Sequence, residues 1–175
     1  MSYVLLSEEE CQYIKSFFSE DTALDGKDPL VLDIDSENTI SIKRKASAKY
    51  LDVTEPELIS FLIEKLSPLK IKSITNNTAK LVRYSKGDYF GKHTDFYKYG
   101  NGASYKTLVI QLSNSEDYKG GNLVVKDVPQ NRELGSFSLF NSSDIHEVTL
   151  ITDGERYSLT LFLVHNDFIH NLSLI

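Results

Sequence analysis

Short apolar segments that alternate with turn residues constrain the fold of this chain more than any other feature. From Thr78 onward such segments recur at regular spacing, and no helical period appears among them. The segments are AKLVRY, YFGKHTD, YKTLVIQLS, GNLVVKD, GSFSLFN, IHEVTLI and RYSLTLFLV, and the turns between them are SKGD, NGAS, EDYKGG, VPQNREL, NSSD and TDGE. This pattern is typical of antiparallel strands in a jelly roll or barrel, which we expect over residues 78–165.

The N-terminal part, residues 1–77, is expected to support this core with helices that pack against one sheet. Ser7 and Glu10 form a capping box ahead of an apolar face, which predicts a helix that runs to about Phe18. Cys11 falls on the apolar face of this helix, where a buried structural thiol is the usual outcome. As the single cysteine of the chain, it has no internal disulfide partner.

A second capping box, Thr54 with Glu57, predicts another amphipathic helix over about residues 55–66. Pro56 would lie in its first turn, where its missing N–H costs nothing. Between the two helices, LVLDID and NTISIK have the character of short strands joined by a turn. The N-terminal part therefore contributes both helices and strands.

Length and charge limit the classes of protein to which the chain can belong. The 175 residues suit one domain over residues 1–175, and a net charge of −6 without a long single-sign block predicts affinity for neither nucleic acid nor anionic membrane. The basic stretch IKRKASAK, residues 42–49, is either a solvated edge or an anion-binding surface. We find no signal peptide or membrane-spanning stretch, so we expect a cytoplasmic protein.

His93 and Asp95 are the first candidate metal ligands. In a strand, side chains two positions apart share a face, with α-carbons about 6.6 Å apart, so both could reach one ion. Of the four histidines, His146 is the best third ligand because it opens a strand after a polar turn, whereas His165 and His170 lie beyond the last apolar strand. Two imidazoles and one carboxylate form the facial triad of non-haem iron(II) oxygenases. An H-x-D pair alone is also common in polar turns.

Arg156 adds weight to the metal hypothesis. It lies ten residues after His146, at the start of the apolar segment RYSLTLFLV, with Ser158 on the same side of the strand. An arginine in such a strand needs an anionic partner. That partner is either Asp153 or Glu155 at a hairpin mouth, or the distal carboxylate of a dicarboxylic cosubstrate.

The ordered set RYSKGDYFGKHTDF, GGNLVV and HEVTLITDGERYSLTLFL strongly resembles the iron(II)- and 2-oxoglutarate-dependent dioxygenases, especially their prolyl 4-hydroxylase-like branch. The resemblance covers about residues 80–164 and implies a mainly β fold, a double-stranded β-helix or jelly roll supported by two or more α-helices. It also implies that His93, Asp95 and His146 are iron ligands. Arg156 would bind the C5 carboxylate of 2-oxoglutarate with the help of Ser158, and Tyr84 would line the cosubstrate pocket.

The cofactor and cosubstrates implied by this resemblance are iron(II), 2-oxoglutarate and O₂, with ascorbate as a stimulating reductant. The implied activity is hydroxylation of an aliphatic C–H bond, with release of succinate and CO₂. The favoured substrate is a prolyl or other residue of a protein or peptide, which the aromatic pair Phe96 and Tyr97 would help to hold. The oligomeric state and the role of residues 165–175 stay open.

Two alternatives remain beside a peptide hydroxylase, and the sequence argues against a third. The substrate could be a free amino acid or small metabolite, and the chain could be a non-catalytic, cupin-like metal-binding scaffold. The related nucleic-acid demethylases carry a second arginine six positions after the first, and this chain has Phe162 there. We therefore expect no nucleic acid among its partners.

Overall fold

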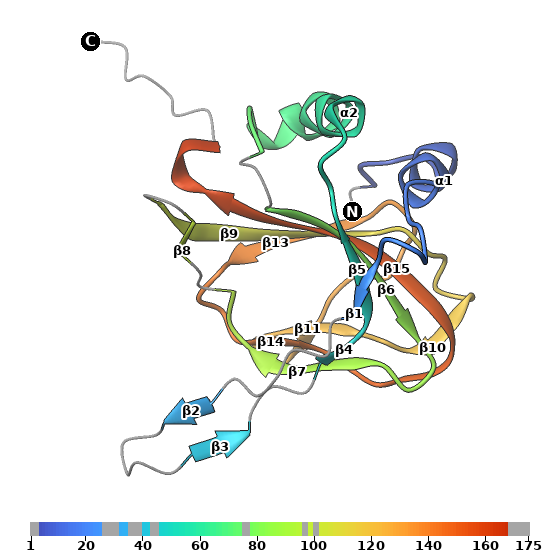
Figure 1. Cartoon of the computed structure of the whole chain (residues 1–175), viewed down its shortest axis with the longest axis vertical. Helices are drawn as coiled ribbons and strands as arrows, with labels where there is room; N and C mark the ends of the chain where they lie inside the picture. The colour runs from blue at the N-terminus through green and yellow to red at the C-terminus, as the bar shows by residue number, and fades with distance from the viewer. Residues whose placement is uncertain are drawn as a thin grey trace.

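Two antiparallel sheets face each other, and two helices cover the outer side of the larger one (Figure 1). The computed structural model describes residues 4–25, 32–34, 40–42, 46–74, 78–95, 98–99 and 102–167. The mainly β class with N-terminal helices is thereby confirmed. The prediction of a single domain over residues 1–175 stays a prediction.

The larger sheet has β15 near its centre, and both neighbours of β15 run antiparallel to it. Two further strands extend it, since β10 pairs with β15 and β8 pairs with β9. Its path is β1 (Leu24–Asp25), β5 (Lys49–Asp52), β6 (Ala79–Ser85), β15 (Ile151–Val164), β9 (Gly102–Gln111) and β13 (Phe137–Asn141), and the further strands are β10 (Tyr118–Gly120) and β8 (Lys98–Tyr99).

The smaller sheet consists of short strands and has β14 and β7 at its middle. Its order is β12 (Val128–Pro129), β11 (Leu123–Val125), β14 (His146–Val148), β7 (Tyr89–His93) and β4 (Ala46–Ser47). The two strands predicted between the helices also form, as an antiparallel pair of β2 (Leu32–Ile34) and β3 (Ile40–Ile42).

The first helix, α1 (Glu8–Lys15), begins with the predicted capping box. The Ser7 hydroxyl accepts from the N–H of Glu10, and the Glu10 carboxylate accepts from the N–H of Ser7. The helix ends three residues before the predicted Phe18, because its last turn tightens: the N–H of Phe18 donates to the carbonyl of Lys15.

The second helix, α2 (Pro56–Leu66), has the predicted extent, and a 3₁₀ turn (Ser67–Leu69) follows it. Its predicted capping box is wrong. The N-cap residue is Glu55, no side chain caps the helix, and the Glu55 carboxylate instead accepts from the N–H of Thr54. Pro56 at the first helical position tolerates this arrangement because it has no N–H to satisfy.

The main core lies between the helices and the larger sheet, where apolar side chains from both α1 and α2 meet those of β6, β9 and β15. Cys11 is fully buried there, as predicted. Successive side chains of β15 alternate, so Leu159, Leu161 and Leu163 face the helices while Arg156 and Ser158 face the smaller sheet. A second, smaller core fills the space between the two sheets. The active-site candidates lie beside this second core.

Four predicted turns contain strand residues: NGAS overlaps β9, EDYKGG contains β10, VPQNREL contains β12, and TDGE lies in β15. The letters TDGE, expected to separate two strands, lie inside β15, which runs unbroken from Ile151 to Val164. The reason is Gly154, which has a φ of +72° and pairs with Tyr118 of β10. A Cβ at Gly154 would lie 2.0 Å from the carbonyl oxygen of Asp117, so only glycine lets β10 approach and extend the ladder.

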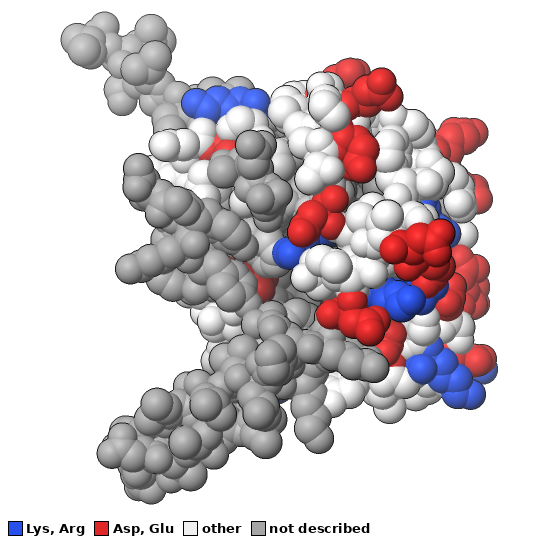
Figure 2. All heavy atoms as spheres, in the orientation of Figure 1, with Lys and Arg blue, Asp and Glu red and all other residues white. Residues whose placement is uncertain are grey.

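The basic stretch at residues 42–49 is only partly described, since residues 43–45 lie outside the described ranges. Its last residue, Lys49, belongs to β5 and forms an ion pair with Glu20 at 3.0 Å. The face shown in Figure 2 carries acidic and basic side chains interspersed, with no broad basic patch among its described residues. Within the described ranges, neither helix is long and apolar enough to cross a bilayer. The cytoplasmic location stays a prediction.

Candidate active site

His93, Asp95 and His146 converge at one end of the smaller sheet. His93 ends β7 and lies opposite His146, the first residue of β14. The Nε2 atoms of His93 and His146 lie 3.3 and 3.0 Å from the two carboxylate oxygens of Asp95. One ligand atom from each residue lies within 4.8 Å of the other two, which is close enough to hold one metal ion. The structure thus brings together the three residues that the sequence analysis predicted as metal ligands.

Both imidazoles are oriented by the backbone. The Nδ1 of His93 lies 2.7 Å from the carbonyl oxygen of Gly91, and the Nδ1 of His146 lies 2.9 Å from that of Asp144. Because a carbonyl oxygen only accepts, each Nδ1 carries the proton and each Nε2 faces the centre of the triad. Phe90 stacks on the His93 ring at 3.6 Å between centroids. The ring planes are therefore fixed by contacts on more than one side.

Asp95 is buried and is held by polar groups on β9 and on the loop after β13. The Thr107 hydroxyl donates to Oδ2 of Asp95 at 2.9 Å, and the N–H of Asp95 donates to the carbonyl of Ser142. Burial disfavours its charge, but the neighbouring His146 and His93 outweigh burial and hold the pKa of Asp95 well below its usual range. Asp95 is therefore a carboxylate, as a ligand to a cation requires.

Arg156 is only 1% exposed, yet neither acid suggested as its hairpin partner pairs with it. Within the described ranges Asp153 pairs with Lys119 and Glu155 with Arg83, each at 3.9 Å. The proposed pairing at the hairpin mouth is therefore wrong.

The guanidinium of Arg156 keeps one donor without a partner. Its Nε donates to Oε1 of Gln111 at 3.2 Å and its Nη1 to the Ser158 hydroxyl at 3.4 Å, and its Cζ lies 5.4 Å from the centre of the Tyr84 ring. Nη2 is buried and has no hydrogen-bond partner among the described residues. Leaving such a group unmet costs about 1–3 kcal/mol. A small carboxylate ligand fits this donor, which agrees with a dicarboxylic cosubstrate.

Thr107 and Gln111 contact the candidate ligands but were not singled out from the sequence. Both are buried polar residues on one face of β9, between the apolar residues Leu108 and Ile110 of the opposite face. The available signal was weak, because the apolar Val109 lies between these two polar residues on the same face of the strand. Phe96 and Tyr97, predicted to hold a peptide, lie outside the described residues.

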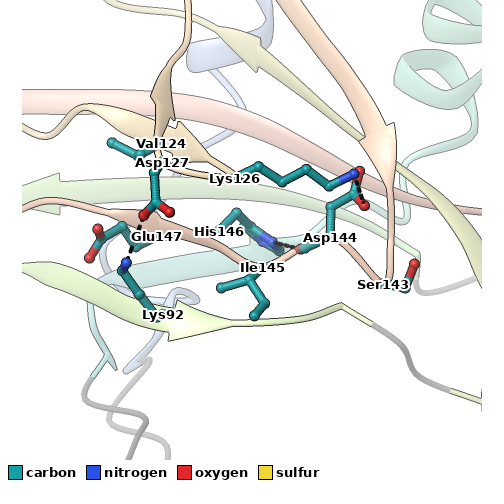
Figure 3. A pocket seen from close by; sticks show the side chains of 9 residues that line it. All are labelled: Lys92, Val124, Lys126, Asp127, Ser143, Asp144, Ile145, His146 and Glu147. Carbon is teal, nitrogen blue, oxygen red and sulfur yellow. Dashed lines mark hydrogen bonds and ion pairs between the residues drawn. The ribbon is translucent and has the colours of Figure 1, made fainter.

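A cleft of about 430 Å³ lies against the smaller sheet, and His146 of the triad is one of the residues that line it (Figure 3). Lys92 and Glu147 line it and alternate along their strands with inward His93 and His146, so they project from the opposite face. Two ion pairs cross its rim, Lys92 with Asp127 and Lys126 with Asp144.

The comparisons with known proteins agree with this geometry. The family model described as the 2OG-Fe(II) oxygenase superfamily matches residues 79–164, the segment that contains every candidate site residue. Through this segment the chain belongs to the 2OG-Fe(II) oxygenase superfamily. Oxygenases of this superfamily use iron(II), 2-oxoglutarate and O₂, and the described residues offer one cluster suited to the metal.

Among curated relatives, this 2OG-Fe(II) oxygenase is 28% identical over 170 residues to a PKHD-type hydroxylase of Prochlorococcus marinus. The aligned region covers 87% of the chain and 72% of the relative. A PKHD-type hydroxylase of Shewanella oneidensis is 35% identical over 89 residues, which covers 46% of the chain and 40% of the relative. The chain therefore spans less than two thirds of some of these relatives.

Solved structures show the same fold. A prolyl hydroxylase of Trichoplax adhaerens, in complex with a hypoxia inducible factor oxygen degradation domain peptide fragment, has a TM-score of 0.66 and 19% identity, and covers 95% of this oxygenase chain and 82% of its own. The viral collagen prolyl hydroxylase of Paramecium bursaria Chlorella virus 1, in complex with 2OG, has a TM-score of 0.61 and 15% identity, and covers 90% of both chains.

Proposed function

We propose that this chain is an iron(II)- and 2-oxoglutarate-dependent dioxygenase that hydroxylates an aliphatic C–H bond of a prolyl or other residue in a protein or peptide. The observation that carries the proposal is the buried Arg156, whose Nη2 lacks a partner within the described ranges, on the same inner side of the sheets as the triad. A scaffold without turnover has no need of such an anchor for a dicarboxylate.

Each residue has a role that its surroundings support. His93, Asp95 and His146 would hold the iron, and the backbone carbonyls of Gly91 and Asp144 keep both Nε2 atoms turned toward it. When bound, the iron and 2-oxoglutarate supply the oxidative chemistry, which converts 2-oxoglutarate and O₂ to succinate, CO₂ and a hydroxylated substrate.

The cosubstrate would be anchored from the larger sheet. Arg156 would bind the C5 carboxylate through Nη2, with Ser158 beside it on the same face of β15. Tyr84, opposite Arg156 in the ladder with β6, would line this pocket. We also propose that the two facing sheets form a double-stranded β-helix over residues 78–165, supported by residues 1–77.

The choice of a peptide substrate is supported by relatives. Curated relatives are named PKHD-type hydroxylases, and the similar Trichoplax adhaerens structure holds a peptide fragment. A free amino acid or small metabolite is the second candidate.

The experiment that tests this function is anaerobic addition of iron(II) and 2-oxoglutarate to the purified protein, with absorbance recorded for the charge-transfer band of a chelated 2-oxoacid. We expect a band in the unchanged protein and a weaker one in Arg156→Ala. Arg83→Ala is the matched control, because Arg83 lies on β6 and pairs with surface acids instead. Succinate release in air, measured with proline-containing peptides and with free amino acids, then separates the two substrate classes. No band in the unchanged protein would contradict the proposal.

A further inference from the structure

We propose that the hydroxyl of Tyr118 is a second donor to the distal carboxylate of 2-oxoglutarate, beside Nη2 of Arg156. This inference rests on the proposed function and adds a cosubstrate-binding residue to it. Tyr118 lies in a segment that the sequence pattern placed in a turn, and the structure places it in β10.

The ladder between β10 and β15 puts Tyr118 next to Arg156. Tyr118 pairs with Gly154, which precedes Arg156 by two positions and so shares its face of the strand. Because Gly154 has no side chain, the backbone of Tyr118 can approach β15 closely, since a Cβ at Gly154 would lie 3.0 Å from the Tyr118 Cα. Tyr118 is 3% exposed and packs in the core between the two sheets, with Tyr84 and Ile151.

Gly121 shows that the two side chains reach the same place. A Cβ built at Gly121 would lie 3.3 Å from Cδ of Arg156 and 3.3 Å from Cδ2 of Tyr118. It would also lie 2.2 Å from Cδ1 of Ile151, so a side chain does not fit there. The side chains of Arg156 and Tyr118 therefore approach the same point of the backbone, at Gly121.

Both residues present an unmet polar atom. The Tyr118 hydroxyl and Nη2 of Arg156 are buried, and neither has a hydrogen-bond partner in the described part of the chain. Buried polar groups are nearly always hydrogen-bonded, so two unmet donors on side chains that both approach Gly121 indicate a missing acceptor. A carboxylate offers two oxygens that accept from both at once.

Arg132 holds the Tyr118 ring from the side. Its guanidinium lies 4.4 Å from the ring centre, and its Nη2 donates to the backbone carbonyls of Tyr118 and Ser115. Its Nη1 donates to Asn122, next to Gly121. The ring is therefore restrained before a ligand arrives, so little side-chain freedom is lost on binding.

The test is a binding measurement that does not depend on turnover. Calorimetry on the Mn(II)-loaded protein gives Kd for 2-oxoglutarate and for 2-oxopentanoate, which has a methyl group in place of the distal carboxylate. We expect Tyr118→Phe to raise Kd for 2-oxoglutarate by about tenfold or more, the usual effect of losing a hydrogen bond to a charged group, and to leave 2-oxopentanoate unchanged. Tyr157→Phe is the matched control, since Tyr157 lies on the opposite face of β15 and packs against the helix side.

Melting curves check that the variant folds. Because the hydroxyl is unmet, its removal should leave Tm of the ligand-free protein unchanged, while the rise in Tm caused by 2-oxoglutarate becomes smaller. If Tyr118→Phe binds 2-oxoglutarate like the unchanged protein while Arg156→Ala does not, the inference is overturned and the proposed function stands. Equal weakening for both 2-oxoacids also overturns it. If the unchanged protein binds no 2-oxoglutarate, the proposed function fails together with it.

Discussion

His146 lies directly opposite His93 in the ladder between β7 and β14, and the centres of their rings are 4.2 Å apart. Cross-strand neighbours are held by the backbone hydrogen bonds of both strands, so this distance is set by the fold and not by flexible side chains. Asp95 follows two positions after His93 and closes the triangle. A metal ion bound here would tie two strands and the loop after β7 together.

Loss of any triad residue should abolish metal retention. We expect His146→Ala to lose the iron that the unchanged protein retains after desalting, because two ligands rarely hold iron(II) in water. Iron in the desalted protein can be measured by elemental analysis. His165→Ala is the control, since His165 lies in the 3₁₀ turn after β15 and contacts Tyr105. Iron retained by His146→Ala would remove His146 from the site.

The hydroxyl of Thr107 should raise metal affinity without touching the metal. Thr107→Val removes the 2.9 Å hydrogen bond to Oδ2 of Asp95 and keeps the side-chain shape. Partners of this kind typically change metal affinity by about 10–100-fold, so we expect Mn(II) to bind more weakly by that factor. Ser138→Ala serves as the control on the neighbouring strand β13, where the Ser138 side chain is buried and the residue lies opposite Val109 of β9. Equal affinity in Thr107→Val and the unchanged protein would contradict this prediction.

The hairpin turn between β11 and β12 is strained. Lys126 and Asp127 have φ values of +50° and +62°, a conformation in which Asn-Gly is strongly preferred. Replacing the pair by Asn-Gly should therefore raise the free energy of unfolding by about 1 kcal/mol, since the lost exposed ion pairs contribute little. Urea denaturation measures the change. Lys119→Asn, at an exposed side chain of β10, should change the free energy of unfolding little. A less stable double variant would show that the ion pairs outweigh the strain.

The thiol of Cys11 should be unreactive in the folded protein. Burial raises its pKa from the usual 9.0 of a thiol to about 11. Two pH units lower the thiolate fraction by about a hundredfold, and the thiolate is the form that reacts. We expect slow labelling by a thiol reagent at pH 8, with the rate rising as pH approaches 11 and as urea unfolds the chain. Fast labelling at pH 8 without urea would indicate that α1 detaches from the sheet.

The recurring apolar segments predicted most strands correctly. In the larger sheet this is because each strand packs one face against the helices and turns the other toward the smaller sheet. The capping box of Ser7 fixed the start of α1 for a local reason, two reciprocal hydrogen bonds within one turn. The prediction failed where contacts distant in sequence decide the outcome. The sequence of β10 contains glycine and shows no apolar alternation. β10 can pair with β15 because Gly154 has no Cβ to block its approach.

In the candidate site too, residues related by local spacing could be predicted, and residues brought together by strand pairing could not. The spacing of His93 and Asp95, two positions apart, indicates their shared side from local geometry alone. Thr107 meets Asp95 only through the packing of β9 against the loop after β7, and Tyr118 meets Arg156 only through the register of β10. Register between strands depends on pairings that the neighbouring letters do not contain. Such residues become visible only in three dimensions.

The unbroken strand β15 has a consequence for the local stability of the site. It pairs along most of its length with β6 on one side and β9 on the other, so the amides around Ser158 and Leu159 open only with the whole sheet. The two histidine ligands instead lie on β7 and β14, short strands whose pairing has a register shift, and Asp95 lies in the loop after β7. Amide exchange should therefore be slowest around the carboxylate anchor and faster around the metal ligands. The part of the site that holds the cosubstrate stays fixed, while the part that holds the metal can open by itself.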